Sequence, residues 1–235
     1  MTVTEPAAPG DAPVVKVTDA WKLHKLGDEV VRALVNASLE VRPGEFVCLM
    51  GPSGSGKSTL LNIIGGLDRP TKGTVQIAGR DTSKITESQF AALRHDKIGY
   101  IFQSYNLIPF LSAVENVELP LMFEPYDRKA LRQRAIDLLT LVGLGHRLHH
   151  QPAKMSGGEQ QRTAIARSLI SNPTLILADE PTANLDHRTG EVVVQTLRDL
   201  CSKLGVTVVA STHDPSVAEQ ASRVVRMKDG QIQPG

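Results

Sequence analysis

Apolar residues follow two different rhythms along this chain. Residues 46–50 form an unbroken apolar run of strand length, and the mostly apolar segments at residues 98–102, 174–178 and 206–210 read as further buried strands. Other segments, such as residues 191–204, repeat their apolar residues at the spacing of a helix turn. Because strand-like and helical segments alternate, the pattern predicts a mainly parallel α/β sheet with helices on its faces.

Shorter β-like runs occur near both ends of the chain. Residues 14–41 form two runs on either side of a turn at residues 26–28, and residues 75–78 resemble a further strand. Residues 223–227 and 231–232 flank Asp229-Gly230, which is typical of a hairpin turn. We expect the N-terminal runs to form an antiparallel layer.

The pattern changes again between residues 104 and 171. This segment reads as helical throughout, and residues 128–142 and 157–170 are its clearest amphipathic helices. Asn172-Pro173 ends the last helix before the chain returns to a buried strand. The expected organisation is a flexible tail at residues 1–13, an α/β core with its antiparallel layer at residues 14–103 and 172–235, and a helical subdomain at residues 104–171.

Composition narrows the classes of partner. The chain has 235 residues, of which 41% are hydrophobic, so it can bury a substantial core, and Cys48 and Cys201 read as buried thiols without a disulfide. Its formal charge is +1 and 4% of its residues are aromatic, which predicts no general attraction to nucleic acid. No run reaches the roughly 20 apolar residues of a membrane span, and no secretory leader precedes the core. We expect a cytosolic or peripheral protein whose membrane spans, if any, come from a partner.

The strongest chemical signal follows the apolar run at residues 46–50. Residues 51–58 read GPSGSGKS and fit the phosphate-binding pattern G-x-x-x-x-G-K-[ST], in the strand-to-helix context that the pattern requires. The glycines let backbone N–H groups turn toward a phosphate, and the positive end of the helix faces the same anion. Lys57 would reach the β- and γ-phosphates, and the Ser58 hydroxyl would bind Mg²⁺. The antiparallel layer would lie over this nucleotide site. An ordinary glycine-rich turn would need the strand, the lysine and the hydroxyl to coincide by chance.

Two carboxylates, Asp179 and Glu180, end a second apolar run. Ligands of open α/β sheets bind at the carboxyl ends of the strands, so Asp179 would hold Mg²⁺ there, directly or through water. Glu180 points to the opposite side and is a candidate to position or deprotonate an attacking water. A solvated cap at a strand end is the simpler alternative for this pair.

A second candidate anion site opens the helix at residues 157–170. Ser156 is suited to cap this helix, and the run Ser-Gly-Gly leaves backbone N–H groups free to meet an anion. The chain thus has two anion-seeking helix starts but one lysine-bearing loop. Either both hold one nucleotide within the chain, or the second serves a nucleotide held by another copy. An ordinary capped surface helix is the simpler alternative here.

These motifs, in this order, resemble the ATP-binding subunit of an ABC transporter over about residues 14–232. The matching stretches are the first nucleotide motif at residues 51–58, the glutamine loop at Gln103, the segment MSGGEQ at residues 155–160, the second nucleotide motif at residues 175–180, the dimer-contact loop at residues 183–186, and the switch histidine His213. The resemblance implies a P-loop ATPase fold and a head-to-tail dimer of two copies that closes around two Mg-ATP. Each ATP would be held by the lysine loop of one copy and the SGG helix start of the other.

The resemblance also implies a role for each matching residue. Glu180 would be the general base, His213 would contact the γ-phosphate, and Gln103 would sense Mg²⁺ and the attacking water, while Ser58, Gln103 and Asp179 would be at the metal. The residues implied to contact ATP are Gly51, Pro52, Ser53, Gly54, Ser55, Gly56, Lys57, Ser58, Thr59 and His24, with Ser156, Gly157, Gly158 and Glu159 from the partner copy. His213 and Asp186 have an alternative role, which is to cap the helices that follow them.

Two departures from the family pattern affect this assignment. His24 stands where the family has an aromatic residue that stacks on adenine, with Trp21 one strand face away as the alternative. Imidazole stacks more weakly than a phenol ring, which predicts loose nucleotide selectivity. Met155 and Glu159 replace commoner residues of the SGG segment, but the backbone donors remain, so we expect activity to survive.

Within the family, the chain is most similar to the branch that powers lipoprotein release, macrolide export and division-associated or peptide-resistance complexes. Such a subunit works at the cytoplasmic face of a bacterial-type membrane with a separate integral permease. Residues 105–123 are apolar enough to dock that partner, or to be core of the helical subdomain. The alternative function is a soluble ABC-type ATPase that acts on nucleic acid or ribosomes, which the single cassette and near-neutral charge disfavour.

Overall fold

A six-stranded sheet forms the centre of the molecule. The computed structural model describes residues 12–27 and 29–234, and within them the strand order of this sheet is β10-β9-β3-β8-β7-β6. Neighbouring strands from β9 to β6 are parallel, and β10 pairs antiparallel with β9. The strands are β3 (Phe46–Met50), β6 (Ile98–Ile101), β7 (Leu175–Asp179), β8 (Thr207–Thr212), β9 (Arg223–Lys228) and β10 (Gln231–Ile232). The predicted mainly parallel α/β sheet is confirmed.

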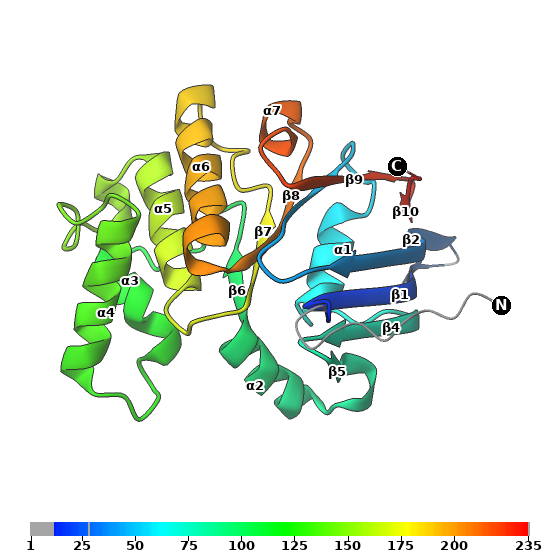
Figure 1. The fold of residues 1–235 in the computed structure, drawn as a ribbon, viewed down its shortest axis with the longest axis horizontal. Coiled ribbons are helices and arrows are strands. Elements are labelled where there is room, and N and C mark those ends of the chain that lie inside the picture. The colour runs from blue at the N-terminus through cyan, green and yellow to red at the C-terminus, as the bar shows by residue number, and fades with distance from the viewer. Residues whose placement is uncertain (1–11, 28, 235) are drawn as a thin grey trace.

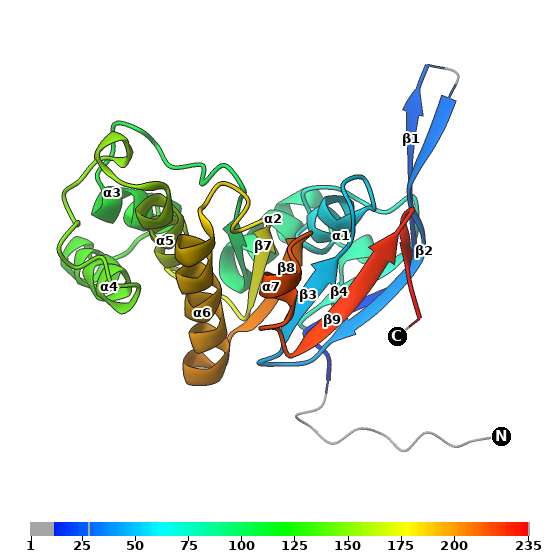
Figure 2. The ribbon, with the colours of Figure 1, turned by 90° about the horizontal axis from the view of Figure 1, so that it is seen from above.

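A smaller antiparallel sheet has the order β2-β1-β4-β5. Its strands are β1 (Val15–Leu26), β2 (Glu29–Val41), β4 (Lys72–Ile77) and β5 (Arg80–Asp81). The β1–β2 pair closes at Leu26 opposite Glu29, and Gly27 takes a φ of 62° in the turn, which costs a glycine no steric strain. Figure 2 shows this hairpin projecting well beyond the rest of the molecule. The predicted antiparallel layer is therefore present.

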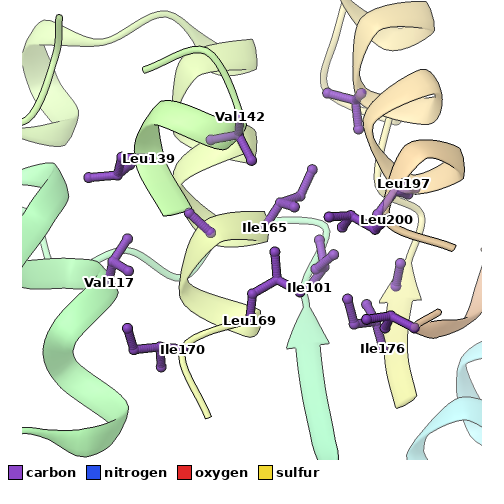
Figure 3. Packing of buried hydrophobic residues seen from close by; sticks show 14 of the residues in the cluster. Ile101, Val117, Leu139, Val142, Ile165, Leu169, Ile170, Ile176, Leu197 and Leu200 are labelled. Carbon is purple, nitrogen blue, oxygen red and sulfur yellow. The ribbon is translucent and has the colours of Figure 1, made fainter. Parts of the chain in front are cut away.

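Two hydrophobic clusters lie on opposite faces of the central sheet. Alternate residues of one strand enter different clusters, since Ile176 belongs to one and Leu177 to the other. The first cluster, in Figure 3, packs β6 and β7 against α5 (Gly157–Ser168) and α6 (His187–Leu204). The second packs the sheet against α1 (Lys57–Ile64), α2 (Glu87–Lys97) and the antiparallel strands. Helices α1 and α5 are therefore separated by the sheet (Figure 1).

The chain between β6 and β7 is less helical than its sequence predicts. It holds α3 (Ala113–Glu118), α4 (Arg128–Leu141) and α5, with the 3₁₀ turns η2 (Leu119–Leu121) and η3 (Pro152–Lys154), whereas residues 102–112 and 142–151 are turns and loops. The side chain of Asn116 explains part of this difference. Its Nδ2 donates to the carbonyls of Ile108, Leu111 and Ser112, so partly buried backbone groups are satisfied without a helix.

Several smaller predictions can be compared with the structure. Helix α6 begins at His187, four residues before the predicted 191, because Asp186 caps it by accepting from the backbone N–H of Thr189 at 3.0 Å. Short elements complete the chain at η1 (Thr82–Lys84) and α7 (Pro215–Ala218). Of the predicted flexible tail at residues 1–13, residues 1–11 lie outside the described part. Over the part that is described, no helix has the length and apolar character needed to cross a bilayer.

Both cysteines are buried and free, as predicted. Burial raises the pKa of the Cys48 thiol to about 12 and that of Cys201 to about 11. Because the thiolate is the reactive form, neither group is suited to nucleophilic or redox chemistry.

Candidate active site

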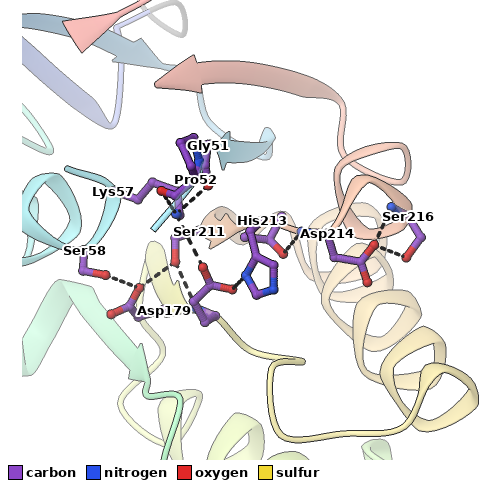
Figure 4. Close-up of polar contacts among 11 residues, drawn as sticks. Gly51, Pro52, Lys57, Ser58, Asp179, Ser211, His213, Asp214 and Ser216 are labelled. Carbon is purple, nitrogen blue, oxygen red and sulfur yellow. Dashed lines mark hydrogen bonds and ion pairs between the residues drawn. The ribbon is translucent and has the colours of Figure 1, made fainter. Parts of the chain in front are cut away.

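The lysine at the end of the loop between β3 and α1 folds back and donates hydrogen bonds to backbone carbonyls of that loop. Lys57 is 6% exposed, and its Nζ donates to the carbonyl oxygens of Gly51 at 2.8 Å and Pro52 at 3.0 Å (Figure 4). Its ammonium group also lies 3.6 Å from Oε1 of Glu180. A buried ammonium in this position gives the loop a fixed positive charge toward which an anion is drawn.

The same loop leaves hydrogen-bonding groups without a protein partner. Gly56 at the start of α1 has a φ of 99°, and a β-carbon there would lie 2.6 Å from the carbonyl oxygen of Ala33. Helix α1 has no side-chain cap, so its first N–H groups remain available. Among the described residues the buried Ser55 hydroxyl also has no hydrogen-bond partner. Unpaired donors at a helix start are what a phosphate group requires, so the loop fits the triphosphate of a nucleotide.

Oxygen ligands for a hard cation meet beside this loop. The Ser58 hydroxyl donates to Oδ1 of Asp179 at 2.9 Å, and the Ser211 hydroxyl donates to the same oxygen at 2.6 Å. Ser58 lies in the first turn of α1 and Asp179 ends β7, so two elements far apart in the sequence bring these oxygens together. Hydroxyl and carboxylate oxygens suit Mg²⁺, which binds proteins through few ligands and keeps several waters.

Glu180 is held from several sides in a strained backbone conformation. Its φ is +46°, a left-handed value that non-glycine residues seldom adopt. Its backbone N–H donates to the Ser211 hydroxyl at 2.9 Å, and its Oε2 lies 2.9 Å from Nδ1 of His213. The Glu180 side chain is 15% exposed, so it is not the solvated strand cap of the alternative interpretation.

His213 does not cap the helix that follows it. That role belongs to Asp214, whose Oδ1 accepts from the backbone N–H of Ser216 at 2.8 Å (Figure 4). The His213 side chain is 65% exposed and turns instead toward Glu180. The alternative capping role is therefore wrong for His213, whereas for Asp186 it is confirmed.

A cavity of about 520 Å³ lies beside these groups, and Asp179 and Ser211 are linked to its lining by their hydrogen bonds with Ser58 and Glu180. The lysine loop, Gln103, Glu180 and His213 lie around it, and the antiparallel layer supplies its other wall. Its lining residues are His24, Val31, Arg32, Ala33, Ser53, Gly54, Ser55, Gly56, Lys57, Ser58, Thr59, Gln103, Glu180, Ala183 and His213. Of the two candidates for stacking on a base, His24 lines the cavity and Trp21 does not.

Three predicted site residues lie at the edge of this arrangement. Gly51 and Pro52 line a neighbouring cavity with His213, and they meet the main site through the hydrogen bonds of their carbonyls with Lys57. The Gln103 carbonyl accepts from Nδ2 of Asn184 at 2.9 Å, which ties the glutamine segment to the loop after β7. Gln103 therefore lies between the cavity and that loop.

The SGG helix start does not line the cavity. Ser156 caps α5 by accepting from the N–H of Glu159 at 3.3 Å, and Oε2 of Glu159 accepts from the N–H of Ser156 at 2.8 Å. Gly157 and Gly158 pack against their own chain, because a β-carbon at Gly158 would lie 2.2 Å from Cγ2 of Thr189. Helix α5 precedes β7 in the chain, so the start of α5 lies toward the carboxyl ends of the strands, as does the start of α1. The two helix starts are on opposite faces of the sheet.

Glu159 carries a negative charge at this helix start, and Arg147 neutralises it. Nε of Arg147 lies 2.8 Å from Oε1 of Glu159, while another guanidinium nitrogen lies 3.2 Å from Nε2 of His150. Burial acts to raise the pKa of Glu159, but hydrogen bonds from Ser156 and Arg147, together with the Arg147 charge, hold that pKa below its ordinary value of 4.5. The carboxylate therefore stays ionised and faces its own chain.

Sequence reasoning missed two residues that organise the site, Ser211 and Arg147, and it placed Asn184 only within the dimer-contact loop at residues 183–186. Ser211 directly precedes Thr212 and His213 at the end of a strand, so its position offered a weak signal. Nothing in the local sequence marks Arg147 or predicts the hydrogen bond from Asn184 to the Gln103 carbonyl. In the expected docking segment, Leu121 is core, whereas Phe110 is 74% exposed and Phe123 is 90% exposed, so that segment contributes both to the core and to the surface.

Comparison with known proteins agrees with this geometry. Residues 34–183 match the family described as ABC transporter. An uncharacterized ABC transporter ATP-binding protein of Thermotoga maritima is 50% identical over 220 residues, which cover 94% of each chain. The macrolide export ATP-binding/permease protein MacB of Syntrophobacter fumaroxidans is 50% identical over 224 residues, which cover 94% of this chain and 31% of that protein. A solved dimeric structure of the ATP-binding cassette MJ0796 in a post-hydrolysis state, bound to ADP and Pi, has a TM-score of 0.86 at 47% identity and covers 94% of this chain and 97% of that one.

Proposed function

Because this chain belongs to the ABC transporter family of ATP-binding proteins and is an ATPase cassette, we propose that two copies close head to tail around two ATP molecules. Each ATP would lie between the Lys57 loop of one copy and the Ser156 helix start of the other. Hydrolysis would open the dimer and drive a separate integral membrane permease. The chain itself would act as a peripheral protein at the cytoplasmic face of the membrane.

One observation carries this proposal: the cavity that holds the lysine loop lacks the second anion-seeking helix start of the same chain. Helices α1 and α5 lie on opposite faces of the sheet, which favours a separate nucleotide for each of the two helix starts. A second copy turned head to tail would supply the missing start to each cavity. The dimeric form of the solved relative supports the same arrangement for this chain.

We assign the chemistry to the residues around the cavity. Lys57 and the backbone donors of residues 53–59 bind the triphosphate, and His24 lies where the base would stack. Ser58 and Asp179 would hold Mg²⁺, which supplies charge stabilisation at the phosphates, with Gln103 near it. Glu180 takes the proton from the attacking water, and His213 orients Glu180 and reaches the γ-phosphate.

The membrane partner is proposed from the relatives and from the exposed surface. The MacB relatives are named as ATP-binding/permease proteins, and this chain spans about a third of their length, 31% to 34% in three examples. The remainder of such proteins would be replaced here by a separate permease. The exposed rings of Phe110 and Phe123, with the half-buried residues between them, supply an apolar surface for it to contact.

Replacing Glu180 with Gln tests the dimer and the base together. Glu180→Gln keeps the shape of the side chain but cannot accept the proton, so turnover should fall by about 10² to 10⁴ while ATP still binds. With ATP and Mg²⁺ it should elute as a dimer in size-exclusion chromatography with light scattering, and with ADP as a monomer. Glu191→Gln, an exposed carboxylate paired with His187, should keep the parent rate. A Glu180→Gln protein that stays monomeric in ATP, or one that hydrolyses at the parent rate, would refute the proposal.

A further inference from the structure

A buried amide joins the SGG helix to the loop that carries Glu180. Gln161 lies on α5, one turn after the helix start, and is 0% exposed. Its Nε2 donates to the carbonyl oxygen of Pro181 at 2.7 Å, and Pro181 directly follows Glu180. Within the described residues, Oε1 of Gln161 is buried and has no hydrogen-bond partner. The amide is therefore fixed in orientation by this single hydrogen bond.

The hydrogen bond acts on a strained part of the backbone. Glu180 has its left-handed φ of +46° between two anchors, which are the Ser211 hydroxyl at its N–H and Gln161 at the carbonyl of the next residue. Conformations of this kind persist only where the surroundings hold them in place. Without Gln161, the peptide after Glu180 is free to relax, and the carboxylate moves away from the position at which it meets the water.

The rest of this helix face is packed against the same loop. A β-carbon at Gly157 would lie 3.2 Å from Cδ2 of Leu185, and one at Gly158 would lie 2.2 Å from Cγ2 of Thr189. The first turn of α5 is therefore packed closely against the segment from Pro181 to Thr189. Gln161 supplies the hydrogen bond of this contact that lies nearest to Glu180. In the head-to-tail dimer the first turn meets the partner's nucleotide, whereas Glu180 serves the nucleotide of its own chain.

We infer that Gln161 is a positioning residue that couples the two composite sites of the dimer. It sets the backbone of Glu180 from the helix that senses the partner's ATP, so the base is correctly placed when that helix start is engaged. This inference rests on the proposed function. It assigns Gln161 no contact with nucleotide or water.

Gln161→Met is the test, because methionine keeps the length and volume of the side chain and removes its amide. The variant loses one hydrogen bond and also loses a buried oxygen without a partner, so its melting temperature should stay within a few degrees of the parent. Its kcat should fall about tenfold, and the Hill coefficient for ATP should fall toward 1. The KM of Gln161→Met should match that of the parent. A Glu180→Gln/Gln161→Met protein should dimerise with ATP as Glu180→Gln does.

Asn116→Leu is the matched control, because Asn116 is a second buried amide of the helical segment, with hydrogen bonds that stay within residues 108–116. It should lower the melting temperature and leave kcat per folded protein and the Hill coefficient unchanged. A Gln161→Met protein with the parent kcat and Hill coefficient would overturn the inference. So would one in which melting temperature, KM and dimerisation all worsen with kcat, since that result indicates a general structural role. Failure of Glu180→Gln itself to dimerise would instead refute the proposed function.

Discussion

The two anion-seeking helix starts of this chain are built in different ways. The start of α1 has no side-chain cap, a lysine folded into its loop, and carboxylates and hydroxyls beside it. The start of α5 is closed by its own capping box, in which Ser156 and Glu159 bond each other, and none of residues 156–159 is a lysine. The first is equipped to hold a nucleotide unaided. The second offers only backbone donors and a fixed position, so it can add to a nucleotide that is already bound.

This difference implies that binding and dimer closure are separable properties. Changes at α1 should alter the affinity of a single copy for ATP. Changes at α5 should leave that affinity intact and alter only the assembly that ATP induces. Each prediction that follows tests one side of this division.

Lys57→Ala should have the largest effect. It removes a buried positive charge from the lining of the cavity. The affinity for ATP should fall by at least about 100-fold, because a charge-assisted hydrogen bond is lost and phosphate charge is left unpaired. Isothermal titration calorimetry on the monomer measures this directly. Lys203→Ala, an exposed lysine that pairs with Asp199 on α6, is the control and should bind ATP normally. Unchanged affinity in Lys57→Ala would mean that the loop does not bind the phosphates.

Gly158→Ala should separate the two properties. The new β-carbon would lie 2.2 Å from Cγ2 of Thr189, so the first turn of α5 must shift relative to its loop. Overpacking of this kind typically costs about 1–3 kcal/mol, enough to weaken ATP-driven dimerisation about tenfold or more in the Glu180→Gln background. Affinity of the monomer for ATP should not change.

A second substitution identifies the cause. Thr189→Ser removes Cγ2 and keeps the hydroxyl that donates to Asp186 at 2.6 Å, so Gly158→Ala/Thr189→Ser should dimerise like Glu180→Gln alone. Dimerisation is measured by light scattering across a range of ATP concentrations. If the double substitution fails to restore dimerisation, the packing of α5 on its own loop does not explain the defect.

The same division marks how far the sequence could predict the site. The Lys57 loop is local, because its strand, glycines, lysine and hydroxyl are neighbours in the chain, and its context was predictable. The capping box at Ser156 is also local and was predicted in part. The Gln161–Pro181, Asn184–Gln103 and Ser211–Asp179 hydrogen bonds join residues 20, 81 and 32 positions apart. No periodicity encodes such contacts, because they depend on which faces the sheet brings together.

Arg147→Gln should have the smallest effect of the three. It leaves the Glu159 carboxylate without its cation at the helix start that would approach the partner's triphosphate in the proposed dimer. An uncompensated charge near a helix start changes binding by about 0.3–1 kcal/mol, so the ATP concentration for half-maximal dimerisation should rise about two- to fivefold. The monomer should bind ATP as before, since Arg147 lies outside the cavity.

Adding Glu159→Gln to this variant should reverse the effect. Glutamine preserves the capping box and removes the negative charge, so the double variant should close at the ATP concentration of the parent. Arg134→Gln is a matched control, because this arginine donates to the carbonyl of Ile170 at 2.8 Å, beyond the other end of the same helix. It should lower stability without shifting the dimerisation midpoint. If Glu159→Gln does not rescue Arg147→Gln, the arginine acts through its contact with His150 rather than through neutralisation of the carboxylate.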